Sequence, residues 1–244
     1  FLCCKNFYIN SQKNTKMLFK KTILLLILLL SITLYSQEKG AVKQNDSLIE
    51  NSSLPLNNGI IYHNKYKNTL KNTNQFFENK YRKGTICYNN QTYFDVNLKY
   101  NVFEDLVFYK PNAKIGLEAN LITKQVDYFI YANKKFKQLN YIDIVEKNGF
   151  FEEIEINNNI TLYIKYKKVC KEDLSLGNIA YTFYDSKLYY ILYNNQLLEI
   201  SSKSSIISIF PNLKKEINTF YKENSKIKDS NIQQFYQNLL KTIN

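Results

Sequence analysis

A regular alternation of apolar and polar residues between Gly84 and Ile200 is the feature that most constrains this fold. Side chains of an extended chain point alternately to its two faces, so such alternation predicts strands with one buried face and one wet face. In Gln91–Tyr100 one face is predicted to carry Phe94, Val96, Leu98 and Tyr100, and the other Tyr93, Asp95, Asn97 and Lys99. In Ile160–Val169 the predicted inner set is Ile160, Leu162, Ile164 and Tyr166, and the outer set is Thr161, Tyr163, Lys165 and Lys167. One wet face is typical of antiparallel sheets.

Asn-rich breaks separate these segments. The dipeptides Asn89-Asn90 and Asn194-Asn195 tolerate positive φ and predict two-residue turns between adjacent strands. Asn157–Asn159 and Asp185-Ser186 are predicted to be further breaks. The predicted strands are 59–62, 84–88, 91–100, 102–109, 115–122, 126–131, 135–139, 149–156, 160–169, 179–184, 187–193 and 196–200. We therefore expect a mainly β (α+β) fold, an antiparallel meander that is barrel-like or two-layered.

After about residue 202 the apolar period becomes helical, and two to three C-terminal α-helices are expected over 202–244. One short helix follows Ser202, and a second begins near Pro211. Asp229-Ser230 is predicted to cap a third. The third helix carries one apolar stripe, formed by Ile232, Phe235, Tyr236, Leu239 and Ile243. These helices are expected to cover an open end or face of the sheet.

The N-terminal region predicts export. Met17 is followed by Lys20-Lys21, an apolar run to Leu34 and the small residue Ser36, a pattern typical of a cleavable signal peptide. The run is shorter than the roughly 20 residues that span a bilayer, although an uncleaved N-terminal anchor remains the alternative. Cleavage is expected near Ser36/Gln37, and no Cys follows the run to carry a lipid. The expected division is a non-native leader (1–16), the signal peptide (17–36), a flexible linker (37–57) and one β-rich domain (58–244).

The net charge of +12 is weak evidence for an acidic partner. Residues 1–36 hold five Lys and no acidic residue, so the rest of the chain carries +7. Arg82 is the only Arg, and Lys is scattered through every segment. Nucleic-acid sites favour Arg and gather basic residues in one patch, so nucleic acid is not an expected partner. Charged outward positions, such as Lys99 and Lys165, also argue against an outer-membrane barrel.

No catalytic constellation is recognisable. The single His, His63, follows a short predicted strand, and neither a Gly-x-Ser-x-Gly nor a His-Glu-x-x-His motif is present. Acidic residues occur at Glu104-Asp105, Glu152–Glu155 and Glu172-Asp173, where Glu153 and Glu155 share a face that we expect to be solvated. The sequence therefore favours a non-catalytic protein with no cofactor and no metal, and assigns no catalytic residue.

Cys87 and Cys170 are the two cysteines of the predicted mature chain. In an oxidising compartment they could form a disulfide or stay unpaired at separate sites, and the sequence leaves both open. Neither belongs to a Cys-x-x-Cys motif. Three tyrosines on predicted outward faces, Tyr93, Tyr163 and Tyr189, form a candidate ligand surface, because exposed Tyr offers amphipathic contact area. The competing interpretation is that Tyr is simply a good strand former.

Two segments carry a family resemblance. They are Lys83–Tyr88 with Tyr93–Leu106, and Lys203–Ile217 with its Phe-Pro-Asn-Leu at 210–213. Together with the Ser36-Gln37 signal, they resemble uncharacterised secreted β-rich proteins of Bacteroidetes. Asn101 stands where that pattern would have Asp. The resemblance implies secretion and a β-rich fold, and it transfers no functional residue.

These observations predict an exported periplasmic or extracellular protein that binds a protein, a peptide or an envelope component. Two alternatives stay open. A periplasmic hydrolase would need a pocket that joins His63 to a nucleophile and a carboxylate. A carrier of small apolar ligands would need a continuous apolar cavity inside a barrel.

Overall fold

A computed structural model describes residues 55–111, 119–140, 148–174 and 177–243, all within the unit Leu54–Asn244. The predicted leader and signal peptide lie outside the described residues, as does the predicted linker up to residue 54. The rest of the predicted linker belongs to the domain, because Leu56 of the short 3-10 helix η1 (Pro55–Asn58) is fully buried in the core.

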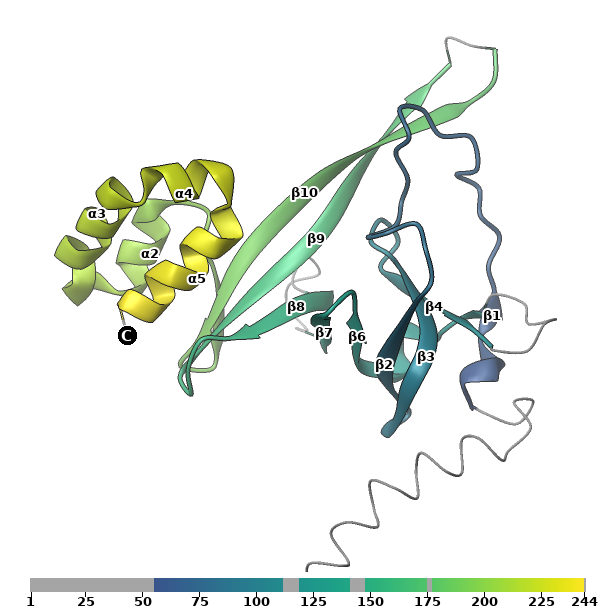
Figure 1. The fold of residues 1–244 in the computed structure, drawn as a ribbon, viewed down its shortest axis with the longest axis horizontal. Coiled ribbons are helices and arrows are strands. Elements are labelled where there is room, and N and C mark those ends of the chain that lie inside the picture. Colours follow the sequence, from purple (N-terminus) through teal and green to yellow (C-terminus); the bar gives the residue numbers. More distant parts are fainter. Residues whose placement is uncertain (1–54, 112–118, 141–147, 175–176, 244) are drawn as a thin grey trace, which may run out of the picture. The chain divides into compact units, whose positions relative to one another are not determined.

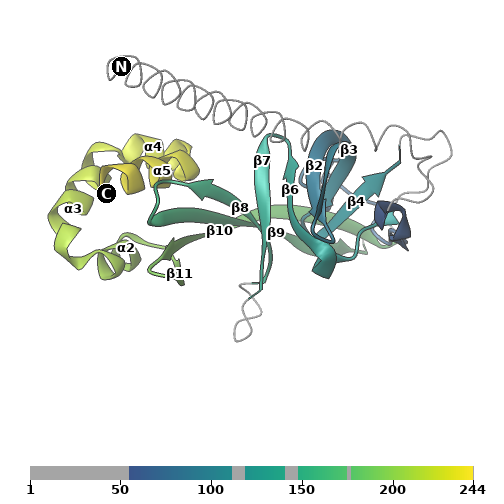
Figure 2. The same cartoon turned by 90° about the horizontal axis from the view of Figure 1, so that it is seen from below.

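In the described part of the chain, eleven strands form one open antiparallel sheet, with β1 and β11 at its edges (Figures 1 and 2). Nine strands are longer than two residues. The strands are β1 (Ile60–Ile61), β2 (Arg82–Tyr88), β3 (Gln91–Asn101), β4 (Leu106–Lys110), β5 (Ala119–Asn120), β6 (Val126–Tyr131), β7 (Lys134–Leu139), β8 (Gly149–Glu155), β9 (Ile160–Asp173), β10 (Ala180–Tyr193) and β11 (Gln196–Glu199). The sheet order is β1-β5-β4-β3-β2-β6-β7-β8-β9-β10-β11. The predicted mainly β meander with C-terminal helices is confirmed, and the sheet does not close.

The Asn-Asn turns have the predicted geometry. Asn89, Asn90, Asn194 and Asn195 all have φ between 51° and 61°, as in a type I′ hairpin turn. Asp185-Ser186, in contrast, is not a break. Asp185 pairs with Lys168 and Ser186 with Lys167 inside the continuous ladder of β9 and β10. Pairing along a long neighbouring strand outweighs the weak local preference of Asp and Ser for turns.

A bulge in β3 overturns the predicted face assignment at its first half. Asp95 has φ of 54°, and the pairing with β2 shifts between Gly84 and Ile86. Residues before the bulge are therefore inverted: Tyr93 is buried (1% exposed), whereas Phe94 is 49% exposed. After the bulge Leu98 and Tyr100 point inward as predicted. One extra residue in a strand reverses the alternation, and sequence alone does not locate it.

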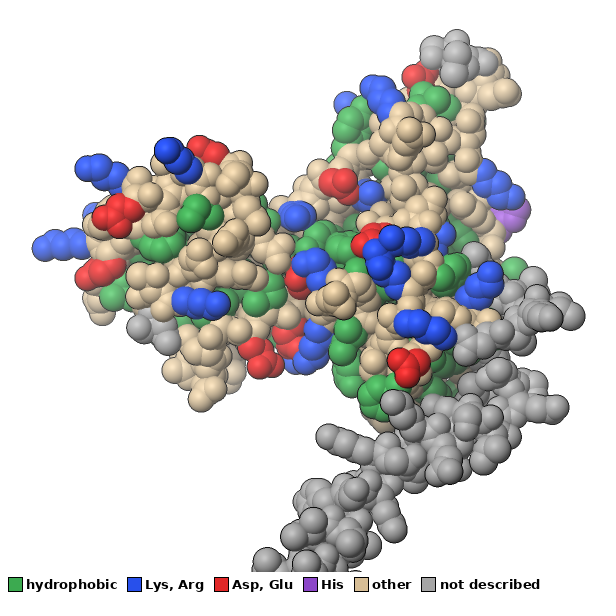
Figure 3. All heavy atoms as spheres, viewed as in Figure 1, with side chains coloured by type: hydrophobic (Ala, Val, Ile, Leu, Met, Phe, Trp, Pro, Cys, Tyr) green, Lys and Arg blue, Asp and Glu red, His purple; other side chains and the backbone are tan. Residues whose placement is uncertain are grey.

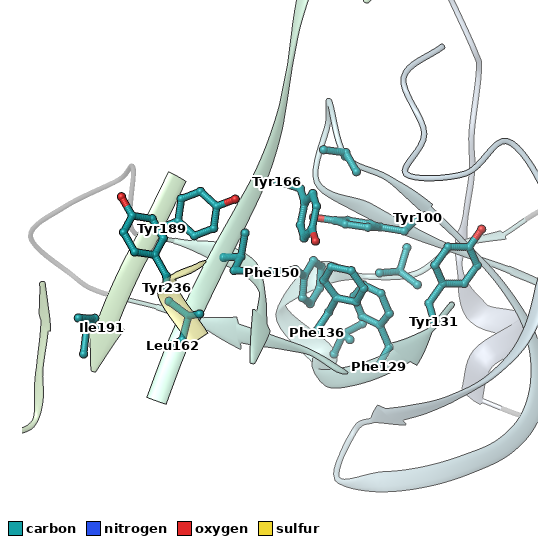
Figure 4. Packing of buried hydrophobic residues seen from close by; sticks show 14 of the residues in the cluster. Tyr100, Phe129, Tyr131, Phe136, Phe150, Leu162, Tyr166, Tyr189, Ile191 and Tyr236 are labelled. Atoms are coloured by element: carbon teal, nitrogen blue, oxygen red, sulfur yellow. The ribbon is translucent and has the colours of Figure 1, made fainter. Parts of the chain in front are cut away.

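Aromatic rings fill the space bounded by the middle of the sheet (Figure 4). Phe129 and Phe136 stack with centroids 4.9 Å apart, and Phe150 meets Phe129 edge-on at 5.0 Å. Tyr100 contacts Phe129 and Phe136, each at 5.2 Å. Such close ring packing makes this region a solid core, where an apolar-ligand carrier would need a cavity.

Four α-helices follow the sheet and lie together beside β10 (Figure 1). They are α2 (Lys203–Ile209), α3 (Lys214–Glu223), α4 (Ser225–Ser230) and α5 (Ile232–Thr242). The 3-10 turn η4 (Pro211–Leu213) joins α2 to α3, and another, η2 (Thr123–Gln125), precedes β6. In the predicted stripe of α5, Phe235, Tyr236, Leu239 and Ile243 are buried and Ile232 is partly buried; Leu240 is buried as well. The cap of α5 is Asn231, which accepts a hydrogen bond from the Gln234 backbone N–H, and not the predicted Asp229-Ser230. Those two residues end α4 instead.

Candidate functional site

A pocket opens among the C-terminal helices. Its volume is about 550 Å³, within the 300–1,000 Å³ typical of small-molecule sites. The lining residues come from the start of α2, from α3, from α4 and from α5: Ser201, Ser202, Lys203, Asn218, Tyr221, Lys222, Lys228 and Tyr236. We refer to this site as the lysine pocket.

Two ammonium groups lie close to one aromatic ring in the lysine pocket, and a third lysine lines the same pocket. The Nζ atoms of Lys203 and Lys228 lie 5.9 and 5.8 Å from the centroid of the Tyr221 ring, within the range of a cation–π contact. Lys222 lies next to Tyr221 in α3 and lines the same pocket. The lining of the pocket is therefore both basic and aromatic.

The two pocket tyrosines are held in place by packing. Tyr221 meets Phe235 edge-on at 4.8 Å, and Tyr236 packs on Tyr189 of β10 at 5.0 Å (Figure 4). Burial, and then the neighbouring Tyr236 hydroxyl, raises the pKa of Tyr221, and burial also raises the pKa of Tyr236. Both phenols are thus neutral at physiological pH, and the hydroxyl oxygen of Tyr221 is buried.

Away from the pocket, Asp105 forms a buried ionic network with Lys165 of β9. Its Oδ2 accepts from Lys165 Nζ at 2.6 Å and from the Phe150 backbone N–H at 3.2 Å, and its Oδ1 accepts from Tyr100 Oη at 2.6 Å. A Cβ at Gly149, whose φ is +99°, would lie 1.8 Å from that Oδ2. Both carboxylate oxygens are occupied and Lys165 is 6% exposed, so this network connects strands and leaves no group for a substrate.

The predicted outward position of Lys165 is therefore a buried one. β9 is a central strand, covered on both faces in its middle: Leu162 and Ile164 belong to the main core, and Tyr163 to a second apolar cluster on the opposite face. The carboxylate of Asp105 offsets the cost of placing the Lys165 ammonium there.

A second network joins the helices to the sheet. Glu152 of β8 accepts hydrogen bonds from Lys134 Nζ (2.6 Å) and Tyr166 Oη (2.6 Å), and from Gln233 Nε2 of α5 (3.4 Å). The next residue, Glu153, points to the other face and binds Lys135 and Lys137. Glu153 was expected on a solvated face, but its side chain is only 6% exposed because these lysines and Tyr163 cover it.

His63 does not meet the conditions for the hydrolase alternative. It is exposed in the segment after β1, and it is not among the residues that line the lysine pocket. Within the described ranges, no group of three His, Cys, Asp or Glu side chains is placed to hold a metal ion.

Cys87 and Cys170 are both free, which corrects the disulfide alternative. Cys87 lies on β2 and Cys170 on β9, and β6, β7 and β8 stand between these strands in the sheet. Strands are spaced about 4.8 Å apart, so the two backbones are not neighbours as a disulfide requires. Cys87 Sγ instead donates to Asp127 Oδ2 at 3.2 Å.

The predicted tyrosine surface is not formed either. Tyr93, Tyr163 and Tyr189 are 1%, 2% and 7% exposed, and they belong to different parts of the fold. Tyr93 is turned inward by the bulge, Tyr163 packs with Phe151, and Tyr189 is covered by α5. Tyr163 lies on the face of β9 opposite the main core, as predicted, but that face is packed. Tyr189 pairs with Ile164 and belongs to the main core, so its predicted outward position is wrong.

Comparisons of the chain with protein-family models, with curated proteins and with solved structures find no match. Among the helices of the described residues, none is both long enough and apolar enough to cross a bilayer. The site must therefore be interpreted from its own chemistry.

The sequence did contain a signal for the lysine pocket. Residues 201–243 hold seven Lys but only three acidic residues. Along the sequence Lys is scattered through every segment, and the surface in Figure 3 shows Lys and Arg interspersed with Asp and Glu. What sequence could not show is that Lys203, Lys222 and Lys228, from three helices, face one cavity.

Proposed function

We propose that this protein is an exported, non-catalytic binding protein whose ligand site is the lysine pocket. The observation that carries the proposal is a cavity of about 550 Å³ lined by side chains from four helices. Small-molecule sites are concave and combine an apolar wall with a few convergent polar groups. Tyr221 and Tyr236 supply the apolar surface, and the three lysines and Asn218 supply the polar groups.

The composition of the wall favours binding over chemistry. Its groups are ammonium, phenol, amide and hydroxyl groups, which can all hold a ligand by hydrogen bonds. The Ser202 hydroxyl is engaged already, since it accepts from the Ser205 backbone N–H as the cap of α2. His63 and the carboxylate networks lie on other elements.

Export rests on the segment from Met17 to Gln37 and on the resemblance to secreted proteins of Bacteroidetes. The test is mass spectrometry of the N-terminal peptide in periplasmic and culture-medium fractions. A mature chain that starts near Gln37 is expected. A chain that retains Met17 in the cytoplasm would refute export.

The binding site is tested by an NMR screen of a mixed small-molecule library against the ¹⁵N-labelled protein. Hits should shift the backbone amides of Ser201–Lys203 and Asn218–Lys222, which border the pocket. Asn218→Trp, which fills the cavity, should abolish those shifts. Thr219→Trp, one residue along the same helix at an exposed position, is the matched control and should retain them. Hits that shift only amides of the sheet, or that bind Asn218→Trp unchanged, would refute the assignment.

A further inference from the structure

The three lysines of the pocket lie apart from the ion pairs of the described structure. Among the described residues, seven contacts of 4.0 Å or less join Lys or Arg to a carboxylate, and all lie between residues 78 and 185. None involves Lys203, Lys222 or Lys228. Glu223 and Asp229 are sequence neighbours of two of these lysines, but neither lines the pocket. In the described structure, three positive charges thus converge on one cavity without an acidic partner.

Like charges at close range repel one another, and cation–π contacts with a single Tyr ring offset this only in part. In the sheet, by contrast, the gathered Lys135 and Lys137 share the carboxylate of Glu153. The missing counter-charge in the lysine pocket points to an anion supplied by the ligand.

We infer that the ligand of the lysine pocket is a small organic phosphomonoester; this inference rests on the proposed binding function. A phosphomonoester carries a charge of about −1.5 to −2 at pH 7 and three strong acceptor oxygens. Three lysine ammonium groups, each a compact point charge with several donors, suit such a group. A carboxylate, with one charge and two oxygens, would leave the cluster under-neutralised.

The remainder of the cavity specifies an organic ester rather than inorganic phosphate. A volume of about 550 Å³ leaves room for a body the size of a sugar or an aromatic ring beside the anionic group. The Tyr221 and Tyr236 side chains supply aromatic contact surface for that body. Asn218 adds an amide that can both donate and accept.

The experiment compares three probes that share a phenyl ring: phenyl phosphate, phenyl sulfate, which has the same shape as the phosphate, and phenol, which lacks the anionic group. Each is titrated into the full mature protein and followed by amide shifts at Ser201–Lys203 and Asn218–Lys222. Phenyl phosphate should bind at least about tenfold more tightly than the singly charged sulfate, and phenol should bind weakest. Raising the salt concentration from 50 to 300 mM should weaken the binding of phenyl phosphate more than that of the other two probes. The lysines are solvent-exposed, so salt screens their charges.

A matched pair of triple variants separates the pocket from general charge. Lys203→Gln with Lys222→Gln and Lys228→Gln removes the cluster. The control, Lys214→Gln with Lys215→Gln and Lys226→Gln, removes the same charge from exposed positions of α3 and α4 outside the pocket. For charge-assisted hydrogen bonds at such exposed groups, we expect each lysine replacement to reduce the affinity for phenyl phosphate by about 3- to 10-fold. Phenyl phosphate binding should thus fall at least about 30-fold in the first variant and less than 3-fold in the control. Both proteins should keep the wild-type circular dichroism spectrum.

Each outcome decides the matter. If phenol or phenyl sulfate binds as tightly as phenyl phosphate, the pocket binds ligands but the phosphomonoester assignment is wrong. If the control variant loses as much affinity as the pocket variant, phenyl phosphate is held only by the overall positive charge of the helices, and the phosphomonoester assignment is again wrong. If phenyl phosphate causes no shift at the pocket up to 10 mM, the inference fails, while the library screen with Asn218→Trp still tests the proposed function separately.

Discussion

Replacing Asp105 by Ala should destabilise the protein far more than replacing Asp185, although both carboxylates pair with a Lys of β9. Asp105 lies 2.6 Å from Lys165, whose side chain is 7% exposed. Asp185 lies 3.0 Å from Lys168 but is itself 80% exposed. Both substitutions remove an ion pair, but Asp105 is more buried than Asp185 and also accepts two further hydrogen bonds, from Tyr100 and Phe150.

The magnitude follows from what each substitution leaves behind. Without Asp105, the Lys165 ammonium, the Tyr100 hydroxyl and the Phe150 N–H lose their acceptor. Breaking a buried pair costs about 3–5 kcal/mol. Because the Asp105 side chain is 26% exposed, we expect the lower end of that range, about 3 kcal/mol. An exposed pair contributes about 0–1 kcal/mol, so Asp185→Ala should cost less than 1 kcal/mol.

Urea denaturation followed by far-ultraviolet circular dichroism measures both values, and tyrosine fluorescence is the second probe because the chain has no Trp. A loss of 3 kcal/mol should also lower the melting temperature by about 6–12 °C. The double variant Asp105→Leu with Lys165→Met removes both charges, and it should recover most of the stability that Asp105→Ala loses. Equal destabilisation by Asp105→Ala and Asp185→Ala would refute the argument that burial governs these pairs.

Three further outcomes are expected. Burial opposes ionisation of Glu153, but hydrogen bonds from Lys135, Tyr163 and Lys137 outweigh burial and lower the pKa of this carboxyl below the usual 4.5. The ionised Glu153 therefore contributes fully to stability above pH 4.5, and this contribution is lost as the pH falls through the folded-state pKa. In an acid titration, the Glu153→Gln variant should lack that part of the loss of stability. Thiol titration should label Cys170 faster than Cys87, since burial raises the pKa of both but Cys87 is also inaccessible, and a slower Cys170 would contradict the fold. Asn231→Ala should cost about 1 kcal/mol in chemical denaturation whereas Asp229→Ala is near neutral, and the reverse order would restore the sequence-based cap.

Local patterns predicted most elements of this fold. Strands such as β6 and β8, and both Asn-Asn turns, were predicted to within a residue or two, because alternation and positive-φ tolerance act over a few neighbouring residues. The apolar stripe of α5 was likewise readable, since a helix brings residues three and four apart onto one face.

Features that depend on distant segments were not readable. The bulge at Asp95 depends on how β3 meets β2, and the burial of Lys165 depends on Asp105, sixty residues earlier. The turn at Asp185 failed to form because β9 extends alongside it as a pairing partner. In each case the energy of a tertiary contact exceeds a local preference worth a few tenths of a kcal/mol to about 1 kcal/mol.

The candidate site shows the same division. The sequence by itself determined a β-rich domain followed by amphipathic helices with an excess of Lys, because composition and periodicity are properties of the chain. Only the tertiary structure decided that Lys203, Lys222 and Lys228 share one pocket while Tyr93, Tyr163 and Tyr189 share none. Convergence of side chains depends on how helices pack against one another, and that packing is set by contacts between residues far apart in the sequence.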